Sequence, residues 1–298
     1  MSRRKRKKLK NAIYHIIVKG IKEVTLFKFQ RDKEEYLNIL SKYKCIHQFK
    51  IYAYCIMNTH AHLLIESNGA DISDFMKQIN LSYAIYYNST YKREGHVFKD
   101  RFKSKIVYNN KYLANSAAYI HKNPKSIPGY KDKLENYKYS SLGIYMNLRE
   151  DRRNLINYDN ADVIMPDIKQ DLNSQDWDSL LADDDNLESN ENKLTFYKNK
   201  MNYLKRNIKP ENIIRFVKNS LNLAENQVGL GKRREAVECG ICILLIHSFS
   251  GIYYKDIFNV LPIVSNKPIN ILRDLGYKYI FKEPIISDFI NKFVSEVY

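Results

Sequence analysis

Two histidines separated by one residue, His60 and His62, have a type and spacing that can do chemistry. They lie in segment 60–66, whose apolar and β-branched composition predicts a strand. Side chains alternate between the two faces of a strand, so both imidazoles project from the same face. Two neutral imidazoles can bind one divalent cation, and phosphate oxygens can complete an octahedral shell around Mg²⁺ or Mn²⁺. Taken alone, the pair is also consistent with two half-exposed strand histidines.

A tyrosine and an asparagine four residues apart, Tyr119 and Asn123, would supply what such a metal needs. Residues at i and i+4 are neighbours on one helical face. Asn123 offers an amide oxygen as a third ligand, and Tyr119 offers a phenol that can attack a phosphodiester as a phenolate. The ordinary phenol pKa of about 10 makes it a weak nucleophile at neutral pH, and a metal that polarises the phosphate eases the attack. Because the chain holds 24 tyrosines, chemistry alone does not single out Tyr119.

Seven predicted elements must position these residues, with helices assigned from 3.6-residue periodicity and strands from apolar, β-branched runs. The predicted order is strand 12–18, helix 31–44, strand 49–57, strand 60–66, helix 71–87, strand 97–108 and helix 111–121. The first six match the split-βαβ, ferredoxin-like arrangement, an antiparallel sheet with helices on one face. The predicted fold class is therefore α+β, followed by a small all-helical C-terminal domain.

Charge is unevenly distributed along the chain, whose formal net charge is +16. Segment 161–192 carries ten acidic residues and one basic residue, which predicts an acidic linker. The predicted domains are a basic arm at 1–10, a catalytic domain at 11–150, the linker at 151–193 and a helical domain at 194–298. The basic remainder suggests nucleic acid as the partner, although basic composition can also serve solubility alone.

Composition excludes several classes of protein. With 44% hydrophobic residues in 298, the chain is not expected to be wholly disordered. The longest apolar run, 241–246, is too short to span a membrane, and no apolar segment follows the basic start, so we expect no membrane association and no secretory signal. Four cysteines do not make a disulfide framework, which favours a cytoplasmic protein. Cys239 and Cys242 lie in an apolar helix and are expected to pack in the core rather than bind zinc.

Four motifs, in order, resemble the single-tyrosine HUH transposases, with the REP-associated tyrosine transposases as the closest branch. The motifs are Asn58-Thr59-His60-Ala61-His62-Leu63-Leu64, the segment from Phe75 to Asn88, Gly95-His96-Val97-Phe98-Lys99-Asp100-Arg101-Phe102-Lys103-Ser104, and Ala118-Tyr119-Ile120-His121-Lys122-Asn123-Pro124. The resemblance implies that His60 and His62 are metal ligands, that Tyr119 is the nucleophile and that Asn123 is a polar third ligand.

The resemblance also implies an activity. Tyr119 would cleave single-stranded DNA, leaving a 5′-phosphotyrosine and a free 3′-hydroxyl, and a second 3′-hydroxyl would complete strand transfer. Mg²⁺ or Mn²⁺ would be the cofactor, and the partners would be a second copy of the chain and short hairpin-containing DNA. Basic side chains of the middle region would contact phosphates. These are Lys92, Arg93, Lys99, Arg101, Lys103 and Lys105.

Residues 194–298 lie outside this resemblance. Some longer members of the family carry a helical extension similar to the DNA-binding end of the replication initiator DnaA. Here a predicted helix from 233 to 246, a turn and a predicted helix at 254–260 have the spacing of a helix-turn-helix. The next segment contains Pro262 and Pro268 and departs from that pattern, so a small helical domain packed on the catalytic domain is the alternative.

Two other functions remain open. The first is a metal phosphoesterase that uses His60 and His62 with water as the nucleophile. The second is a catalytically inactive or domesticated hairpin-DNA-binding protein. A Tyr119→Phe variant separates the first from a transposase, because only the transposase loses a covalent DNA adduct. The second predicts hairpin binding that survives loss of the site, with no cleavage.

Overall fold

The structure, a computed structural model, describes residues 8–9, 11–168, 203–228, 234–261, 267–282 and 284–297. The described residues divide into two compact units. The first contains those up to Tyr203 apart from 45–47, and the second contains 45–47 and those from Leu204 onward. Most of the predicted basic arm, and the predicted linker from residue 169, lie outside the described residues.

The first unit contains a four-stranded antiparallel sheet. Its strands are β1 (Ile13–Lys19), β2 (Lys50–Ile56), β3 (His60–Glu66) and β4 (Lys103–Val107). They are ordered β2-β3-β1-β4, and each neighbouring pair is antiparallel. The two central strands, β1 and β3, are joined through a helix and a hairpin, as a split βαβ requires. The predicted α+β fold class is confirmed.

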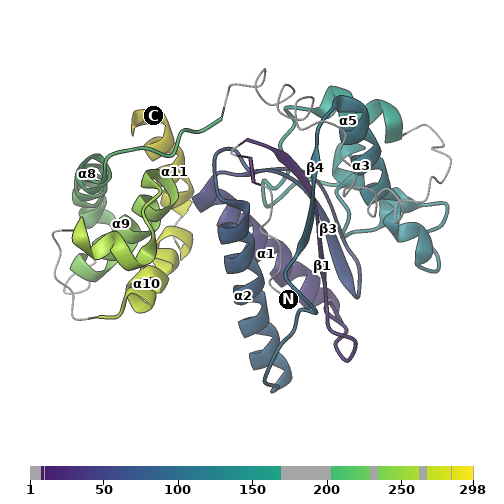
Figure 1. Cartoon of the computed structure of the whole chain (residues 1–298), viewed down its shortest axis with the longest axis horizontal. Helices are drawn as coiled ribbons and strands as arrows, with labels where there is room; N and C mark the ends of the chain where they lie inside the picture. The colour runs from purple at the N-terminus through teal and green to yellow at the C-terminus, as the bar shows by residue number, and fades with distance from the viewer. Residues whose placement is uncertain are drawn as a thin grey trace. The chain divides into compact units, whose positions relative to one another are not determined.

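Helices cover both faces of this sheet (Figure 1). They are α1 (Gln30–His47), α2 (Ile72–Tyr91), α3 (Asn110–Lys122) and α5 (Ala161–Ile168). As predicted for the first six elements, α1 and α2 share one face, while α3 and α5 lie on the other. Alternation along β3 explains both layers, because Ala61 and Leu63 are buried toward α1 and α2, and His62 and Leu64 are buried toward α3.

In the first unit, the element boundaries agree with the predicted ones to within three residues except at two places. The helix predicted to end at residue 87 continues to Tyr91, and Asp71 caps its start by accepting a hydrogen bond from Ser73 N at 2.7 Å. The prediction of a strand over 97–108 is wrong in its first half, because β4 begins only at Lys103. Phe98 forms an isolated bridge with Gly20, and bends at 99–101 separate this bridge from β4.

The first part of the predicted linker is packed onto the first unit. Ile156 forms a parallel bridge with Ile51 of β2, and Asn157 N donates to Ile51 O at 2.8 Å. Ile164 of α5 is fully buried, and α5 packs against α3. The apolar residues of segment 151–168 therefore extend the folded unit beyond the predicted boundary at residue 150.

The second unit is helical, as predicted. It contains α8 (Pro210–Val228), α9 (Arg234–Ser250), the short 3-10 helix η5 (Tyr254–Asn259), α10 (Ile269–Lys282) and α11 (Pro284–Val297). Helices α9 and α10 meet at Gly240 and Gly276, where a Cβ on Gly240 would lie 2.1 Å from Leu272 O. Only glycine permits so close an approach of two helix backbones.

The buried interior of α9 includes the two cysteines of the C-x-x-C motif. Cys239 and Cys242 are both buried, as predicted, and burial raises the pKa of Cys239 to about 11. The element after the turn is a 3-10 helix, and the helix-turn-helix interpretation stays a prediction. No helix among the described residues combines the length and apolarity needed to cross a membrane.

Candidate active site

The site lies on the face of the sheet that α3 covers, and strand register brings its histidines together. In the register, His62 of β3 is opposite Ile17 of β1, and His15 of β1 is opposite Leu64. His15 and His62 are therefore diagonal neighbours on one face. Their rings are hydrogen-bonded, with His15 Nε2 3.0 Å from His62 Nδ1.

His60 is the more exposed member of the pair predicted from the sequence. Its ring centroid is 5.0 Å from that of His62, and the two rings are nearly perpendicular. Its Nδ1 lies 2.9 Å from Thr59 Oγ1. His60 also hydrogen-bonds the side chain of Asn123, which follows α3. The His-x-His pair therefore faces α3 and its C-terminal end.

Tyr119 reaches the histidines from α3 of the same chain. Asn109 fixes the start of this helix by accepting a hydrogen bond from Tyr112 N at 2.6 Å. The Tyr119 ring lies edge-on to two imidazoles, 5.3 Å from His62 and 5.7 Å from His15 between ring centroids. The structure thus brings together a phenol and two imidazoles that are far apart in sequence.

Asn123 forms hydrogen bonds with both Tyr119 and His60. Its Nδ2 donates to the Tyr119 carbonyl oxygen at 2.9 Å, and its side chain hydrogen-bonds His60. Pro124 follows at the start of a 3-10 turn, which ends α3 at this point. The residue predicted as a third ligand is thereby held next to the first.

Burial keeps the three imidazoles neutral at pH 7. Burial, with a smaller effect from the charge of Lys105, lowers the pKa of His15 to about 4. Burial also lowers the pKa of His62 well below its ordinary value, and neighbouring His15 and His60 add to this. The pKa of His60 is lowered by burial too, although its hydrogen bond with Asn123 opposes the shift. A neutral imidazole is the form that binds a metal ion.

The site can bind a divalent cation if some of the ligands come from outside the chain. In the tautomer in which His62 Nδ1–H donates to His15 Nε2, Nε2 of His62 carries no proton and is the nitrogen suited to ligation. Within the part of the chain that the structure describes, no three His, Cys, Asp or Glu side chains are grouped to hold a metal ion. A cation here would combine two imidazoles and a carboxamide with oxygen ligands from outside the chain.

His15 is a site residue that the sequence analysis missed. It is 2% exposed, and its Nδ1 has no hydrogen-bond partner among the described residues. The predicted topology already placed the first strand beside the third. A histidine on the face of β1 that carries His62 in β3 could therefore have been found by combining topology with strand alternation.

The six basic residues predicted to contact phosphates differ in their exposure to solvent. Five of them lie at least partly exposed, between the end of α2 and the start of β4: Lys92, Arg93, Lys99, Arg101 and Lys103. Lys105 is only 8% exposed and is paired with His15 across β1 and β4. Its charge therefore acts within the histidine site rather than on the surface.

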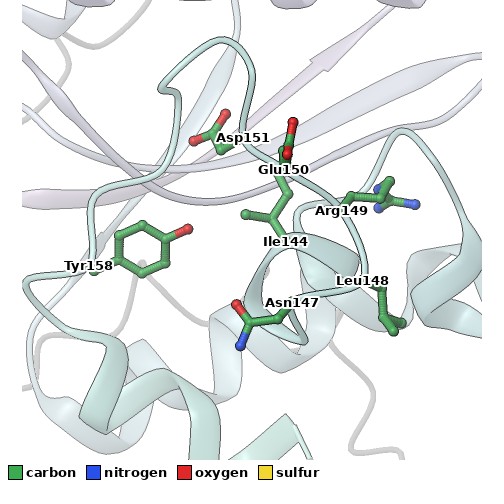
Figure 2. Close-up of a pocket in the computed structure, with 7 residues that line it drawn as sticks. All are labelled: Ile144, Asn147, Leu148, Arg149, Glu150, Asp151 and Tyr158. Carbon is green, nitrogen blue, oxygen red and sulfur yellow. The ribbon is translucent and has the colours of Figure 1, made fainter.

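Two further features of the first unit lie apart from this chemistry. His121 is buried and hydrogen-bonded to Ser141 Oγ at 2.8 Å, and burial lowers its pKa to about 3. A hollow of about 350 Å³, drawn in Figure 2, lies between Ile144 and Tyr158 and contains none of the predicted site residues. Arg149, in its lining, donates to backbone carbonyls such as Ser140 O at 2.8 Å, so its guanidinium has a structural role.

Comparison with known proteins bears on the segment that holds His15, His60, His62, Tyr119 and Asn123. Residues 8–123 match the protein family described as "Transposase IS200 like". Among solved structures, the chain is similar to one described as "Structure of the REP associates tyrosine transposase bound to a REP hairpin", at 17% identity and a TM-score of 0.43, over 49% of this chain and 86% of that chain. No curated protein gives a match to the sequence. The resemblance predicted from the motifs is confirmed, since residues 8–123 are similar to the IS200-like transposases.

Proposed function

We propose that this protein is a metal-dependent transposase that cleaves and rejoins single-stranded, hairpin-containing DNA through Tyr119. The observation that carries the proposal is the contact of the Tyr119 ring with His62 and His15, at 5.3 and 5.7 Å between centroids. A phenol beside neutral imidazoles that can bind a metal ion suits phosphoryl transfer to a tyrosine. All three residues come from one chain, which supports a site assembled in cis.

The proposed reaction is a pair of transesterifications. The phenolate oxygen of Tyr119 attacks phosphorus, a phosphorus–oxygen bond to the tyrosine forms, and the bond from phosphorus to the 3′ oxygen breaks. The departing oxygen takes up a proton and becomes a free 3′-hydroxyl. A second 3′-hydroxyl then attacks the phosphotyrosine, forms the new strand and releases the phenol. Because each step exchanges one phosphodiester for another, no nucleotide cofactor is required.

The chain's own residues would hold the cation and order the site. His60, His62 and Asn123 would bind Mg²⁺ or Mn²⁺, which when bound supplies polarisation of the scissile phosphate. His15 would fix the orientation of His62 through its hydrogen bond, as partners of metal-ligating histidines commonly do. The ammonium of Lys105, on the same face, would favour an anionic phosphate beside these imidazoles.

The decisive experiment determines which end-labelled DNA fragment becomes covalently attached to the protein. A hairpin oligonucleotide with single-stranded flanks is incubated with the protein and Mn²⁺ or Mg²⁺, then resolved under denaturing conditions. A 3′-end label should move with the protein, and a 5′-end label should appear on a shortened free strand. Tyr119→Phe retains the ring that packs on His62 and removes only the nucleophile. We expect it to lower adduct formation at least about 10³-fold.

Tyr112→Phe is the matched control, since it removes a hydroxyl from the same helix and should leave the adduct yield unchanged. Cleavage by Tyr119→Phe without an adduct would overturn the proposal in favour of a phosphoesterase that uses water. Hairpin binding without cleavage at any Mg²⁺ or Mn²⁺ concentration would overturn it in favour of an inactive DNA-binding protein.

The partner and localisation predictions are also proposals. We propose a homodimer in the cytoplasm, associated with the nucleoid through its DNA substrate. Light scattering of the purified chain, with and without hairpin DNA, tests the dimer. The phosphate contacts predicted for Lys92, Arg93, Lys99, Arg101 and Lys103 are tested by the salt dependence of binding, because each lost phosphate contact should reduce the salt slope by about 1.

A further inference from the structure

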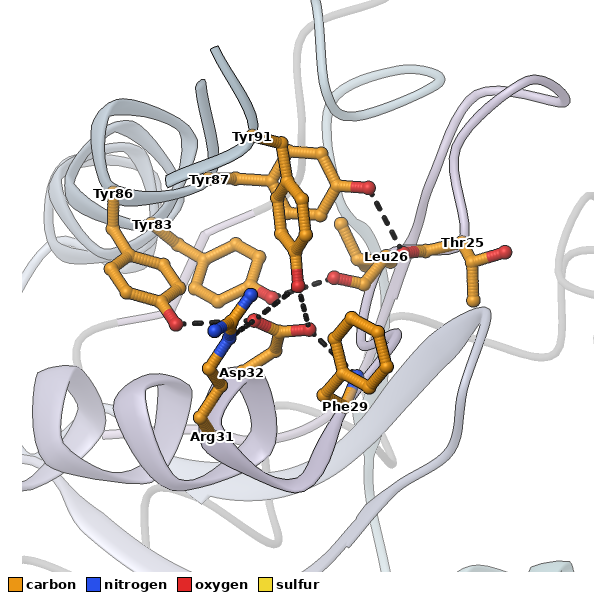
Figure 3. Close-up of polar contacts among 9 residues, drawn as sticks. All are labelled: Thr25, Leu26, Phe29, Arg31, Asp32, Tyr83, Tyr86, Tyr87 and Tyr91. Atoms are coloured by element: carbon orange, nitrogen blue, oxygen red, sulfur yellow. Dashed lines mark hydrogen bonds and ion pairs between the residues drawn. The ribbon is translucent and has the colours of Figure 1, made fainter. Parts of the chain in front are cut away.

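Two aromatic rings at the start of α1 form a surface that the proposed reaction does not use. Phe29 is 48% exposed although it is a large apolar side chain. Its ring is stacked on that of Tyr91, at the end of α2, with centroids 6.5 Å apart and planes inclined by 24°. Figure 3 shows both rings beside Arg31. The exposed face of Phe29 is thus backed by a second ring.

Two cations flank these rings. Lys28 Nζ lies 5.3 Å from the Phe29 centroid and 5.9 Å from that of Tyr91. Arg31 Cζ lies 5.2 and 5.5 Å from the same two centroids. The Lys28 and Arg31 side chains are exposed. A flat aromatic face between two exposed cations offers stacking to a base and charge to the adjoining phosphates.

A buried carboxylate holds this surface in place. Asp32 is fully buried, and its oxygens accept hydrogen bonds from Tyr91 OH at 2.7 Å, Tyr86 OH at 3.1 Å and Phe29 N at 2.8 Å. The dashed lines in Figure 3 trace these contacts. The exposed Arg31 also pairs with this carboxylate, with Nε 3.9 Å from Asp32 Oδ1, so its guanidinium is held beside the rings. The rings are thereby ordered before any ligand arrives, which lowers the entropy lost on binding.

The surface lies at the end of the sheet where β3 begins. Phe27 N donates to Asn58 O at 2.8 Å, and Lys33 Nζ donates to Asn58 Oδ1 at 2.7 Å. Asn58 precedes His60 by two residues. The loop that carries Phe29 is therefore hydrogen-bonded to the turn that leads into the histidine pair.

We propose that Phe29, Tyr91, Lys28 and Arg31 form a stacking site for an unpaired base of the DNA strand. The proposal rests on the proposed function for the identity of the strand, and it adds a binding site outside the cleavage centre. Stacking tolerates any base because every base has a π face. The site would therefore bind the single-stranded flank of a hairpin without reading its sequence.

The test compares strands with and without bases. Binding of the full-length protein to a fluorescein-labelled single strand, and to a deoxyribose-phosphate strand of equal length with abasic positions, is followed by anisotropy in EDTA. We expect Phe29→Ala to weaken binding to the base-containing strand about 5- to 150-fold, which is the 1–3 kcal/mol lost per stacked base. Binding to the abasic strand should not change.

Two variants control for folding and for loss of any exposed ring. Phe29→Tyr keeps a ring and should bind within about twofold of the original chain. Tyr158→Ala removes a ring that is 53% exposed elsewhere in the first unit and should leave binding unchanged. Unaltered binding by Phe29→Ala, or equal weakening on both strands, would overturn the proposal.

This test is separable from that of the proposed function. A base-dependent effect of Phe29→Ala, together with no Tyr119 adduct under any metal condition, would leave the stacking site standing and remove the strand-transfer proposal. An adduct that requires Tyr119, together with no effect of Phe29→Ala on binding, would support the strand-transfer proposal and remove the stacking site.

Discussion

Asp32, in the first turn of α1, and His15, in β1 on the face that α3 covers, are both buried polar side chains. Both oxygens of Asp32 accept hydrogen bonds, from two tyrosine hydroxyls and a backbone N–H. His15 has one hydrogen bond, to His62, and its other ring nitrogen has no partner among the described residues. Native structures rarely leave buried polar atoms unpaired. Asp32 thus connects α1 to α2 through several hydrogen bonds, whereas His15 is bonded to one residue of the histidine site.

The largest expected effect on stability comes from removing the Asp32 carboxylate, which accepts several hydrogen bonds. Asp32→Ala leaves the hydroxyls of Tyr86 and Tyr91 and the Phe29 N–H without their acceptor. Hydrogen bonds to a charged group contribute about 1.5–3 kcal/mol each, so we expect a loss of at least about 3 kcal/mol in the free energy of unfolding. Urea denaturation measures it.

Asp100→Ala is the comparison for that substitution, since Asp100 is exposed and accepts a hydrogen bond from the neighbouring Arg101 N at 2.8 Å. Its effect should be within about 0.5 kcal/mol. Equal stability of the two variants would contradict the stabilising role of the hydrogen bonds to Asp32.

The histidine cluster should respond differently. His15→Leu removes one neutral hydrogen bond and leaves Nδ1 of the buried His62 unpaired, while it replaces a second unpaired nitrogen with apolar burial. The free energy of unfolding should therefore fall by about 1–2 kcal/mol, less than for Asp32→Ala. Loss of the group that orients His62 should weaken Mn²⁺ binding about 10- to 100-fold. Titration calorimetry with Mn²⁺ and no DNA reports this directly.

His121→Leu provides the control for burial of a histidine in the same unit, because His121 bonds Ser141 rather than His62. It should retain Mn²⁺ affinity. If His15→Leu binds Mn²⁺ as tightly as His121→Leu, His15 has no role in orienting His62.

The smallest expected effect is at alkaline pH. Burial, assisted by the hydrogen bond to Asp32, raises the pKa of Tyr86 to about 12, against about 10 in the unfolded chain. Folding therefore favours the protonated phenol. Its contribution to stability is complete below pH 10 and is lost as the pH rises from 10 toward 12. Tyr86→Phe should flatten the decline of the unfolding midpoint over this range, and an unchanged slope would contradict the shift.

Local pattern was enough to predict the strand that carries the His-x-His pair. The prediction for 60–66 matches β3 residue for residue, because both faces of a central strand are buried and its apolar run is continuous. The prediction failed over 97–102, where Phe98 and its neighbours have strand composition. There a single bridge to Gly20 is followed by bends, and tertiary context overrides propensity.

The contacts that assemble each cluster could not be read from local sequence. Tyr86 and Asp32 are 54 residues apart in the chain, and no periodicity pairs one tyrosine among 24 with one acid. His15 and His62, 47 residues apart, are related by register, which is a property of the assembled sheet. Resemblance to a family pointed to Tyr119 where chemistry alone did not, and it gave no reason to examine His15.

One hydrogen bond at the end of α3 has a mechanical consequence. Asn123 Nδ2 is bonded to the carbonyl oxygen of Tyr119, one helical turn earlier. The Tyr119 phenol and the Asn123 carboxamide are therefore both attached to helix α3, while the imidazoles are attached to the sheet. A displacement of α3 would move both groups away from the imidazoles together, so the site would be assembled or taken apart in one step.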